Sequence, residues 1–151
     1  MAWDGWVRDS RPIADRIRGE LVELSLDGKR ALLLAEDIEA LERVRRSRSI
    51  RLLPSFDVYL LSHRDKSHLV DDAHCKAVYR NAGWISQTVL VDGRVAGVWT
   101  HRRRGRRLAV HVRPFGRLDQ DVVASIRAEA GDLARFLGMS EADLRVGDDR
   151  A

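Results

Sequence analysis

The chain has 151 residues, enough for one ordinary domain or for a domain with a small subdomain. Hydrophobic residues make up 44% of it, so it can bury a core and is not expected to be disordered throughout. Basic residues outnumber acidic ones by 27 to 23, which gives a formal net charge of +4. The single cysteine excludes an internal disulfide, no apolar run is long enough to cross a bilayer, and no secretory signal opens the chain. We therefore expect a cytoplasmic protein with no membrane association.

The first predicted element is a helix that begins near Ser10. Ser10 is a suitable N-cap and Pro12 fits the first helical turn. The apolar residues at helical spacing are Ile13, Ala14 and Ile17. Gly19 is expected to end the helix.

A two-stranded ribbon follows. Apolar residues are frequent from Leu21 to Leu26, Asp27-Gly28 is a hairpin signal, and Arg30 to Leu34 returns as the second strand. A helix that leads into such a ribbon is the second half of a winged helix. Only residues 3–9 are available for the missing helices, so residues 1–46 are predicted to form a partial winged helix with its wing hairpin. A further helix is predicted from Glu36 to Arg45.

Residues 43–51 contain five arginines and two serines, which is typical of an exposed connection. We place a boundary there and assign residues 47–138 to a β-rich subdomain. Residues 139–151 are polar and acidic, and they are predicted to be a flexible tail.

The β-rich subdomain should contain a three-stranded antiparallel meander and a packing helix. Leu52 to Leu61 is apolar enough for a buried strand or turn, although Pro54 excludes a regular central strand at that point. The predicted meander strands are Ile85–Val91, Val95–His101 and Leu108–Val112, with turns at Asp92-Gly93 and Arg104-Gly105, and the predicted helices are Asp71–Tyr79 and Asp119–Leu137. The fold class is therefore α+β: a partial winged helix, then a small antiparallel β-meander or half-barrel, then the C-terminal helix.

Five arginines surround one glycine at the second predicted turn of the meander. They are Arg102, Arg103, Arg104, Arg106 and Arg107. Arginine favours planar, bidentate contact with phosphate, and nucleic acid is the commonest target of such a cluster. The alternative is a solvated turn that binds nothing.

Other candidate sites are weaker. His63, His68, His74 and Cys75 do not have the spacing of a structural zinc site, so no metal and no cofactor is expected. His74 is adjacent to Cys75, and adjacent helical residues point in different directions, so His74 is a poor base for that thiol. Asp57 and Arg64-Asp65 are interpreted as an internal salt-bridge network that fixes the turn before the meander.

Two motifs together resemble a known family. The segment Leu52-Leu53-Pro54-Ser55-Phe56-Asp57 and the later Val91-Asp92-Gly93-Arg94-Val95-Ala96-Gly97 are similar to the C-terminal part of winged-helix DNA-binding proteins that include the AlkZ-type DNA glycosylases. The resemblance covers residues 10–137. It implies tandem winged helices that cradle DNA, with a β-rich portion packed against them. Glu20–Leu34 would then match a wing and Arg102–Arg107 a basic hairpin that faces DNA.

The resemblance also implies a catalytic Gln-x-Gln or Gln-x-Asp motif in the N-terminal winged-helix region of the glycosylases. This chain is expected to start after that region. It has only Gln87 and Gln120, far apart in sequence, so no catalytic residue can be assigned.

We predict non-catalytic binding of double-stranded DNA through its phosphates, as the C-terminal portion of a winged-helix protein. The main contacts are assigned to the five arginines of the turn. The secondary contacts are assigned to Arg11, Arg16, Lys29 and Arg30. The alternative is a protein–protein module, which forms a homodimer or docks on an N-terminal winged-helix companion and completes a glycosylase in trans. Apolar residues near Trp3, Trp6, Ile13 and Leu21 favour that alternative.

Overall fold

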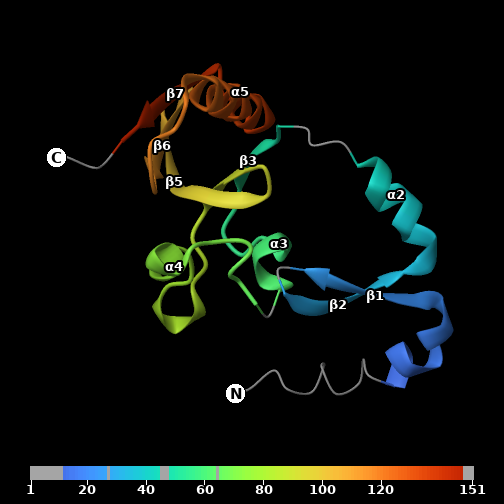
Figure 1. Ribbon diagram of the computed structural model, residues 1–151. Helices are drawn as coiled ribbons and strands as arrows, with labels where there is room; N and C mark the ends of the chain where they lie inside the picture. The colour runs from blue at the N-terminus through green and yellow to red at the C-terminus, as the bar shows by residue number, and fades with distance from the viewer. Residues whose placement is uncertain (1–11, 27, 45–47, 64, 148–151) are drawn as a thin grey trace. The chain divides into compact units, whose positions relative to one another are not determined.

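The computed structural model describes residues 12–26, 28–44, 48–63 and 65–147 (Figure 1). The chain divides into two compact units, Met1–Arg46 and Ser47–Ala151. Helices and strands occur in both units, and the mixed α+β class is confirmed. Each unit has its own sheet.

The first unit is a two-stranded ribbon with short helical segments before its first strand and after its second. Its elements are a helical segment at residues 12–16, η1 (Arg18–Glu20), β1 (Leu21–Leu26), β2 (Lys29–Leu34), η2 (Ala35–Asp37) and α2 (Ile38–Arg43). The strands are antiparallel, with Leu21 opposite Leu34 and Leu26 opposite Lys29, so the predicted ribbon is confirmed. Among the side chains of this unit that the structure describes, none is fully buried.

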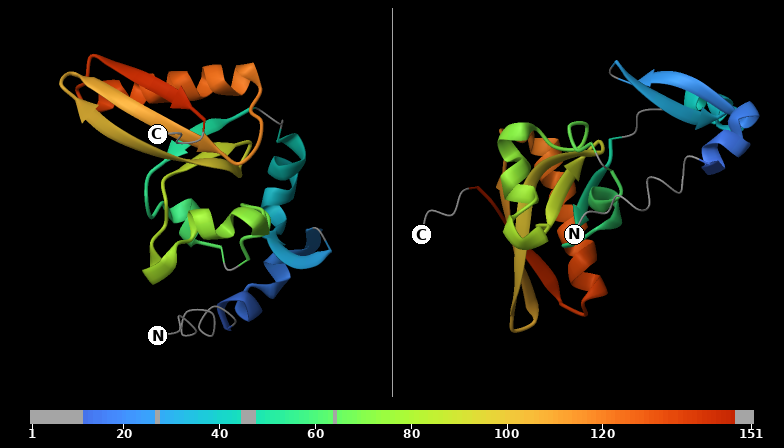
Figure 2. Two further views of the ribbon diagram at one scale, coloured as in Figure 1. Left: turned by 90° about the vertical axis from the view of Figure 1, so that its left-hand side faces the viewer. Right: turned by 90° about the horizontal axis from the view of Figure 1, so that it is seen from below.

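The second unit is built on a five-stranded sheet in the order β3-β4-β5-β6-β7. Its elements are β3 (Ile50–Leu53), α3 (Val58–Leu61), α4 (Asp72–Val78), η3 (Asn81–Gly83), β4 (Thr88–Val91), β5 (Arg94–Arg104), β6 (Arg107–Pro114), α5 (Gln120–Phe136) and β7 (Glu141–Val146). The neighbouring strands are antiparallel except β6 and β7, which are parallel. Figure 2 shows the β5–β6 hairpin extending as a long ribbon beside α5.

Two cores lie on the two faces of this sheet. On one face α5 packs against the strands, and Ile126 of the helix belongs to the same buried cluster as Trp99 and Leu108 of the sheet. On the other face Leu60 of α3 and Val78 of α4 pack over β4 and the start of β5. The helices therefore cover both faces, with α3 and α4 on the side opposite α5 (Figure 1).

A β-bulge in β5 lets that strand contribute to both cores. Leu90 pairs with Val95 and Val89 pairs with Gly97, so Ala96 is the extra residue. In a regular strand Val95 and Trp99 would face the same side, because side chains alternate with period two. The bulge directs Val95 to the core under α3 and α4, and Trp99 to the core under α5.

Local sequence signals explain the ends of several elements. Asp92 and Gly93 have φ values of 51° and 82°, the two positive angles that a type I′ hairpin turn requires. β3 is an edge strand and ends immediately before Pro54, whose nitrogen has no hydrogen to donate to the β3–β4 ladder. The Asp57 carboxylate accepts a hydrogen bond from the Tyr59 amide at 2.9 Å and begins α3.

Three sequence predictions need correction. The strand predicted from Ile85 begins only at Thr88, and the hairpin turn lies at Gly105-Arg106, one residue later than predicted. The predicted flexible tail of 139–151 is wrong for Glu141–Val146, which forms β7. Ala142, Leu144 and Val146 alternate along β7 and pack on the α5 core, and this burial offsets the entropy of ordering the segment.

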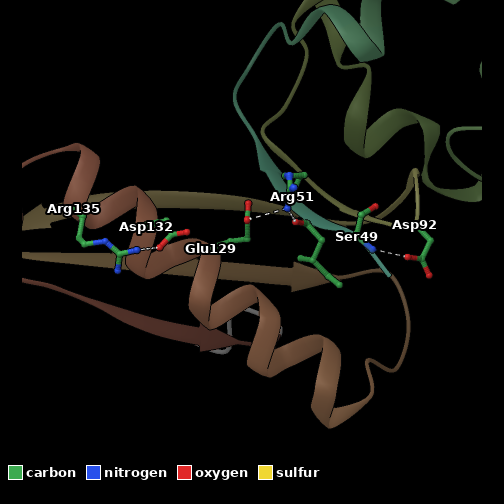
Figure 3. A network of polar contacts seen from close by, with 7 residues as sticks. Ser49, Arg51, Asp92, Glu129, Asp132 and Arg135 are labelled. Carbon is green, nitrogen blue, oxygen red and sulfur yellow. Dashed lines mark hydrogen bonds and ion pairs between the residues drawn. The ribbon is translucent and has the colours of Figure 1, made fainter. Parts of the chain in front are cut away.

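Polar contacts fix the start of the second unit to the rest of it (Figure 3). The Ser49 amide donates to the Asp92 carboxylate at 2.8 Å, which ties the approach to β3 to the β4–β5 turn. Arg51 Nη1 donates to Glu129 Oε1 of α5 at 3.2 Å. The sheet edge and the long helix are thereby held in register.

Candidate nucleic-acid interface

The arginine cluster lies at the tip of the β5–β6 hairpin. Arg104 pairs with Arg107, and Gly105 and Arg106 form the two-residue loop between them. Gly105 has a φ of 59° and Arg106 has a negative φ, the pattern of signs of a type II′ turn. Glycine is favoured at that first position because it has no Cβ to strain the left-handed backbone. The turn therefore brings five guanidinium groups to one end of the sheet.

All five arginine side chains at the tip are exposed. They do not lie on one surface, because side chains alternate across a strand. Arg103 pairs with Leu108 and shares the face that α5 covers further along the strands. Arg102 pairs with Ala109 and, with Arg104, lies on the opposite face, beyond the part that α3 and α4 cover. The tip thus presents cations on both sides of the hairpin.

One of the five arginines is already paired within the protein. Arg107 Nε lies 2.9 Å from Glu141 Oε1, and its Nη2 lies 2.7 Å from Asp143 Oδ1. Both acidic residues belong to β7, so Arg107 fastens the parallel strand to the hairpin. Among the described residues, the guanidinium groups of Arg102, Arg103, Arg104 and Arg106 form no ion pair within 4.0 Å. We therefore assign Arg107 a structural role and leave the other four as candidate ligand contacts.

The loop after α5 holds the tip in place. The backbone carbonyl of Arg106 accepts hydrogen bonds from the Ser140 amide at 2.8 Å and from the Ser140 hydroxyl at 2.9 Å. The contact gives the arginine turn a fixed position relative to α5.

A shallow depression of about 440 Å³ lies on the open face of the sheet below the tip. Its lining includes Arg102, Arg104, His111 and Asp143, together with Arg145 of β7. The His111 ring nitrogen Nε2 lies 2.9 Å from the Gly147 carbonyl oxygen. Sequence reasoning missed Arg145 and His111. The signal was the alternation of apolar and polar residues in Glu141–Val146, which identifies a strand.

The residues predicted to make secondary DNA contacts all belong to the first unit. Arg11 lies outside the described residues, and nothing is described of the Lys29 side chain beyond the place of its backbone in β2. Arg16 is exposed on the helical segment 12–16. Arg30 is exposed but pairs with Glu23 across the ribbon, with 2.6 Å between Nη2 and Oε2. That pair lowers the charge that Arg30 can offer to a ligand.

The histidines have neighbours other than a metal. The His63 and His68 rings lie 4.6 Å apart in a T-shaped pair, and His74 stacks on Phe115 at 4.2 Å. In the part of the chain that the structure describes, no three histidine, cysteine or acidic side chains come close enough to hold an ion. No helix within the described ranges is long and apolar enough to span a membrane.

Asp57 and Asp65 both make turn contacts, and the salt-bridge network predicted for them with Arg64 stays a prediction, because Arg64 lies outside the described residues. Asp57 begins α3 through the Tyr59 amide, and Asp65 accepts from the Ser67 amide at 2.9 Å and from its hydroxyl at 2.7 Å. Asp71 pairs with Arg94, with 2.6 Å between Oδ1 and Nη2. Hydrogen bonds between residues two apart in sequence therefore stabilise both of these turns.

Cys75 is poorly suited to nucleophilic catalysis. Burial raises the pKa of its thiol above the usual 9.0, and the nearby Asp72 and Asp71 carboxylates raise it further. A thiol with a raised pKa carries little thiolate at neutral pH, and the thiolate is the nucleophile. Lys66 has a structural contact. Its Nζ donates to the Leu60 carbonyl at 2.6 Å, and burial lowers its pKa below 10.5.

A profile of the DNA glycosylase AlkZ-like family matches residues 2–136. The chain belongs to this family. The interstrand DNA cross-link repair glycosylase of Streptomyces sahachiroi is 38% identical over 128 residues, which are 84% of this chain and 33% of that protein. The solved structure of Streptomyces sahachiroi DNA glycosylase AlkZ matches 90% of this chain with a TM-score of 0.75 and 36% identity.

The chain spans about a third of the length of these relatives, 33% of the curated protein and 36% of the solved chain. We therefore assign the chain to the family without assigning it the activity of the longer relatives. The two glutamines of the sequence prediction lie in separate elements: Gln87 precedes β4, and its amide contacts His101 at 3.3 Å, whereas Gln120 begins α5. No Gln-x-Gln or Gln-x-Asp motif occurs in the sequence.

Proposed function

We propose that this chain binds the phosphate backbone of double-stranded DNA through the tip of the β5–β6 hairpin, without catalysing base removal. The observation that carries the proposal is the set of four exposed arginines that have no carboxylate partner among the described residues. Crowded like charges are unfavourable in the free protein, and a polyanion relieves their repulsion. Relationship to a family of DNA glycosylases supports DNA as that polyanion.

The proposal includes the place of this chain in the larger fold. The helical segment 12–16 and the β1–β2 ribbon correspond, in our interpretation, to the remaining part of a winged helix, with the ribbon as its wing. The second unit then corresponds to the β-rich C-terminal portion of the glycosylases. Sequence specificity should be weak, because phosphate contacts position a protein on DNA and do not read its bases.

Salt dependence tests the proposal directly. Four phosphate contacts predict that log affinity for a duplex falls with log salt concentration with a slope of about −3.6, since each contact contributes about −0.9. Fluorescence anisotropy with a labelled duplex at several salt concentrations measures this slope. An affinity that does not change with salt, or no binding at low salt, contradicts the proposal.

A matched pair of variants locates the contacts. R102Q/R104Q removes two charges from the tip and should reduce the magnitude of the slope by about 1.8. R117Q/R127Q removes the same number of exposed charges away from the tip, before α5 and on it, and should leave the slope unchanged. Equal effects of the two variants would mean that net charge, and not the hairpin, controls binding. Release of alkylated bases by the chain alone would contradict the non-catalytic part.

A second candidate function is a protein–protein module, and the first unit favours it. No described side chain of that unit is fully buried, and Ile13, Leu32 and Leu41 are 60%, 53% and 54% exposed. A two-stranded ribbon is marginally stable alone, so an apolar partner would stabilise it. The partner would be an N-terminal winged-helix companion, which would complete a glycosylase in trans, or a second copy of the chain. Light scattering distinguishes the two partners. A dimer of the chain alone supports a second copy, whereas a monomer whose mass rises when the companion is added supports the companion.

A further inference from the structure

The second unit has a hollow that the hairpin does not use. It lies at the end of α4 and around η3, and its volume is about 560 Å³. Its lining residues are Lys76, Tyr79, Arg80, Asn81, Ala82 and Trp84. Small-molecule sites in proteins have volumes of about 300–1,000 Å³, so the hollow has the capacity for a nucleotide.

The hollow has an exposed aromatic wall. The Trp84 side chain is 49% exposed, and Phe56, which packs against it, is 44% exposed. The two ring centroids lie 5.0 Å apart with the planes at 76°, so the edge-on contact holds the indole in place and leaves much of its surface open. On the inner side the Tyr79 hydroxyl donates to the Leu60 carbonyl at 3.1 Å, which fixes a second ring.

The backbone holds this wall in an unusual conformation. Phe56 and Ala82 have φ values of 61° and 59°, in the left-handed region that residues other than glycine rarely adopt. A hydrogen bond of 2.7 Å from the Arg80 amide to the Trp84 carbonyl closes the loop around Ala82. Such conformations are concentrated at ligand sites, where they hold side chains ready for contact.

Two cations stand beside the aromatic wall. Lys76 and Arg80 are exposed, and within the described ranges neither side chain forms an ion pair or a hydrogen bond. Exposed aromatic rings beside unpaired cations are the combination with which proteins bind single-stranded nucleic acid: the ring stacks on a base, and the cation contacts the adjoining phosphate. An aromatic surface for a protein partner does not require the unpaired cations.

We infer that this hollow binds an unstacked nucleobase together with its phosphate, with Trp84 as the stacking platform and Lys76 and Arg80 as phosphate contacts. The inference deepens the proposed DNA-binding function and rests on it for the identity of the polymer. The hairpin tip would hold the duplex backbone, and the hollow would favour DNA in which one base has left the stack. The protein should therefore bind a distorted duplex more tightly than a regular one.

The test compares two duplexes. One is fully paired, and the other is identical except for a single extra, bulged 2-aminopurine. The protein should quench the fluorescence of the bulged base and bind that duplex more tightly than the paired one. Trp84→Ala should weaken binding of the bulged duplex about tenfold, the loss of one base–aromatic stack, and should leave the paired duplex unaffected. Trp84→Phe should restore most of the loss. Phe136→Ala is the matched control, because Phe136 is 86% exposed on α5, away from the hollow.

The salt dependence of binding tests the roles of Lys76 and Arg80. K76Q/R80Q should reduce the magnitude of the salt slope for the bulged duplex by about 1.4, at about 0.7 for each contact with a single strand, and should leave the slope for the paired duplex unchanged. Thermal melting of each variant confirms that it is folded before binding is compared.

The outcomes separate this inference from the proposed function. Salt-dependent binding of the paired duplex with no preference for the bulge, and no effect of Trp84→Ala, would overturn the inference and leave the hairpin proposal standing. Binding of the bulged duplex alone, lost in Trp84→Ala, would support the inference and overturn the hairpin proposal. A change in the mass of the protein in Trp84→Ala, with DNA binding intact, would show a protein-docking surface and overturn the inference.

Discussion

The β1–β2 ribbon and the β5–β6 hairpin are built from similar sequence patterns but have different surroundings. Both are antiparallel pairs joined by two-residue turns. In β6, Leu108, Val110 and Val112 are at most 1% exposed because α5 and the neighbouring strands cover them. In β2, Leu32 is 53% exposed. Alternation therefore predicts that strands pair, whereas burial depends on what the rest of the chain places over them.

The test with the largest expected effect compares one leucine of β6 with one leucine of β2. Leu108→Ala should lower the free energy of unfolding by about 2–5 kcal/mol, because Leu108 is fully buried and its loss leaves a cavity. Leu32→Ala should change it by less than about 0.5 kcal/mol. Urea denaturation measures both. An equal loss in Leu32→Ala would show that a partner or a second copy covers the ribbon in solution.

A second test probes how closely the hairpin strands approach. A Cβ added at Gly97 would lie 2.7 Å from the Arg113 carbonyl oxygen and 2.9 Å from Pro114 Cα, so the backbone must move. Gly97→Ala should cost about 1–3 kcal/mol of unfolding free energy, as overpacking does. Gly116→Ala, which meets nothing within 4 Å, is the control and should be nearly neutral. A neutral Gly97→Ala would mean that β5 and β6 separate easily.

A third test should strengthen the sheet beside the hairpin. The Thr88 hydroxyl is fully buried, and no hydrogen-bond partner for it occurs among the described residues. Thr88→Val replaces it with a methyl group of similar size and should stabilise the second unit by about 1 kcal/mol, since an unpaired buried polar group is costly. Chemical denaturation measures the gain, and destabilisation would reveal a partner for the hydroxyl.

The smallest expected change in stability comes from the acidic residues of β7. E141Q/D143N removes both partners of Arg107 and should cost less than about 1 kcal/mol, because exposed ion pairs contribute little. The same variant frees a fifth arginine, so the salt slope for duplex DNA should steepen by about 0.9. Glu23→Gln, which frees Arg30 in the ribbon, is the matched change in the first unit. An unchanged slope in E141Q/D143N would place Arg107 away from DNA.

Local patterns predicted most of the elements. The Asp92-Gly93 turn, the meander and the long helix Gln120–Phe136 were predictable because each depends on residues close in sequence. β7 was not predicted, although its apolar and polar residues alternate, because three of its six residues are charged and its parallel partner β6 lies far away in sequence. Long-range pairing also decided the arginine site: nothing near Arg107 in sequence indicates that Glu141 and Asp143 neutralise it.

The bond between Ser140 and the Arg106 carbonyl makes the arginine tip depend on the length of α5. The helix has 17 residues, about 25 Å, and acts as a rigid spacer between the base of the sheet and its far end. Removing one residue from its middle would rotate everything beyond by about 100° and carry Ser140 away from the tip. Related chains that keep the arginine turn should therefore tolerate substitutions along the exposed side of α5 but not insertions or deletions within it.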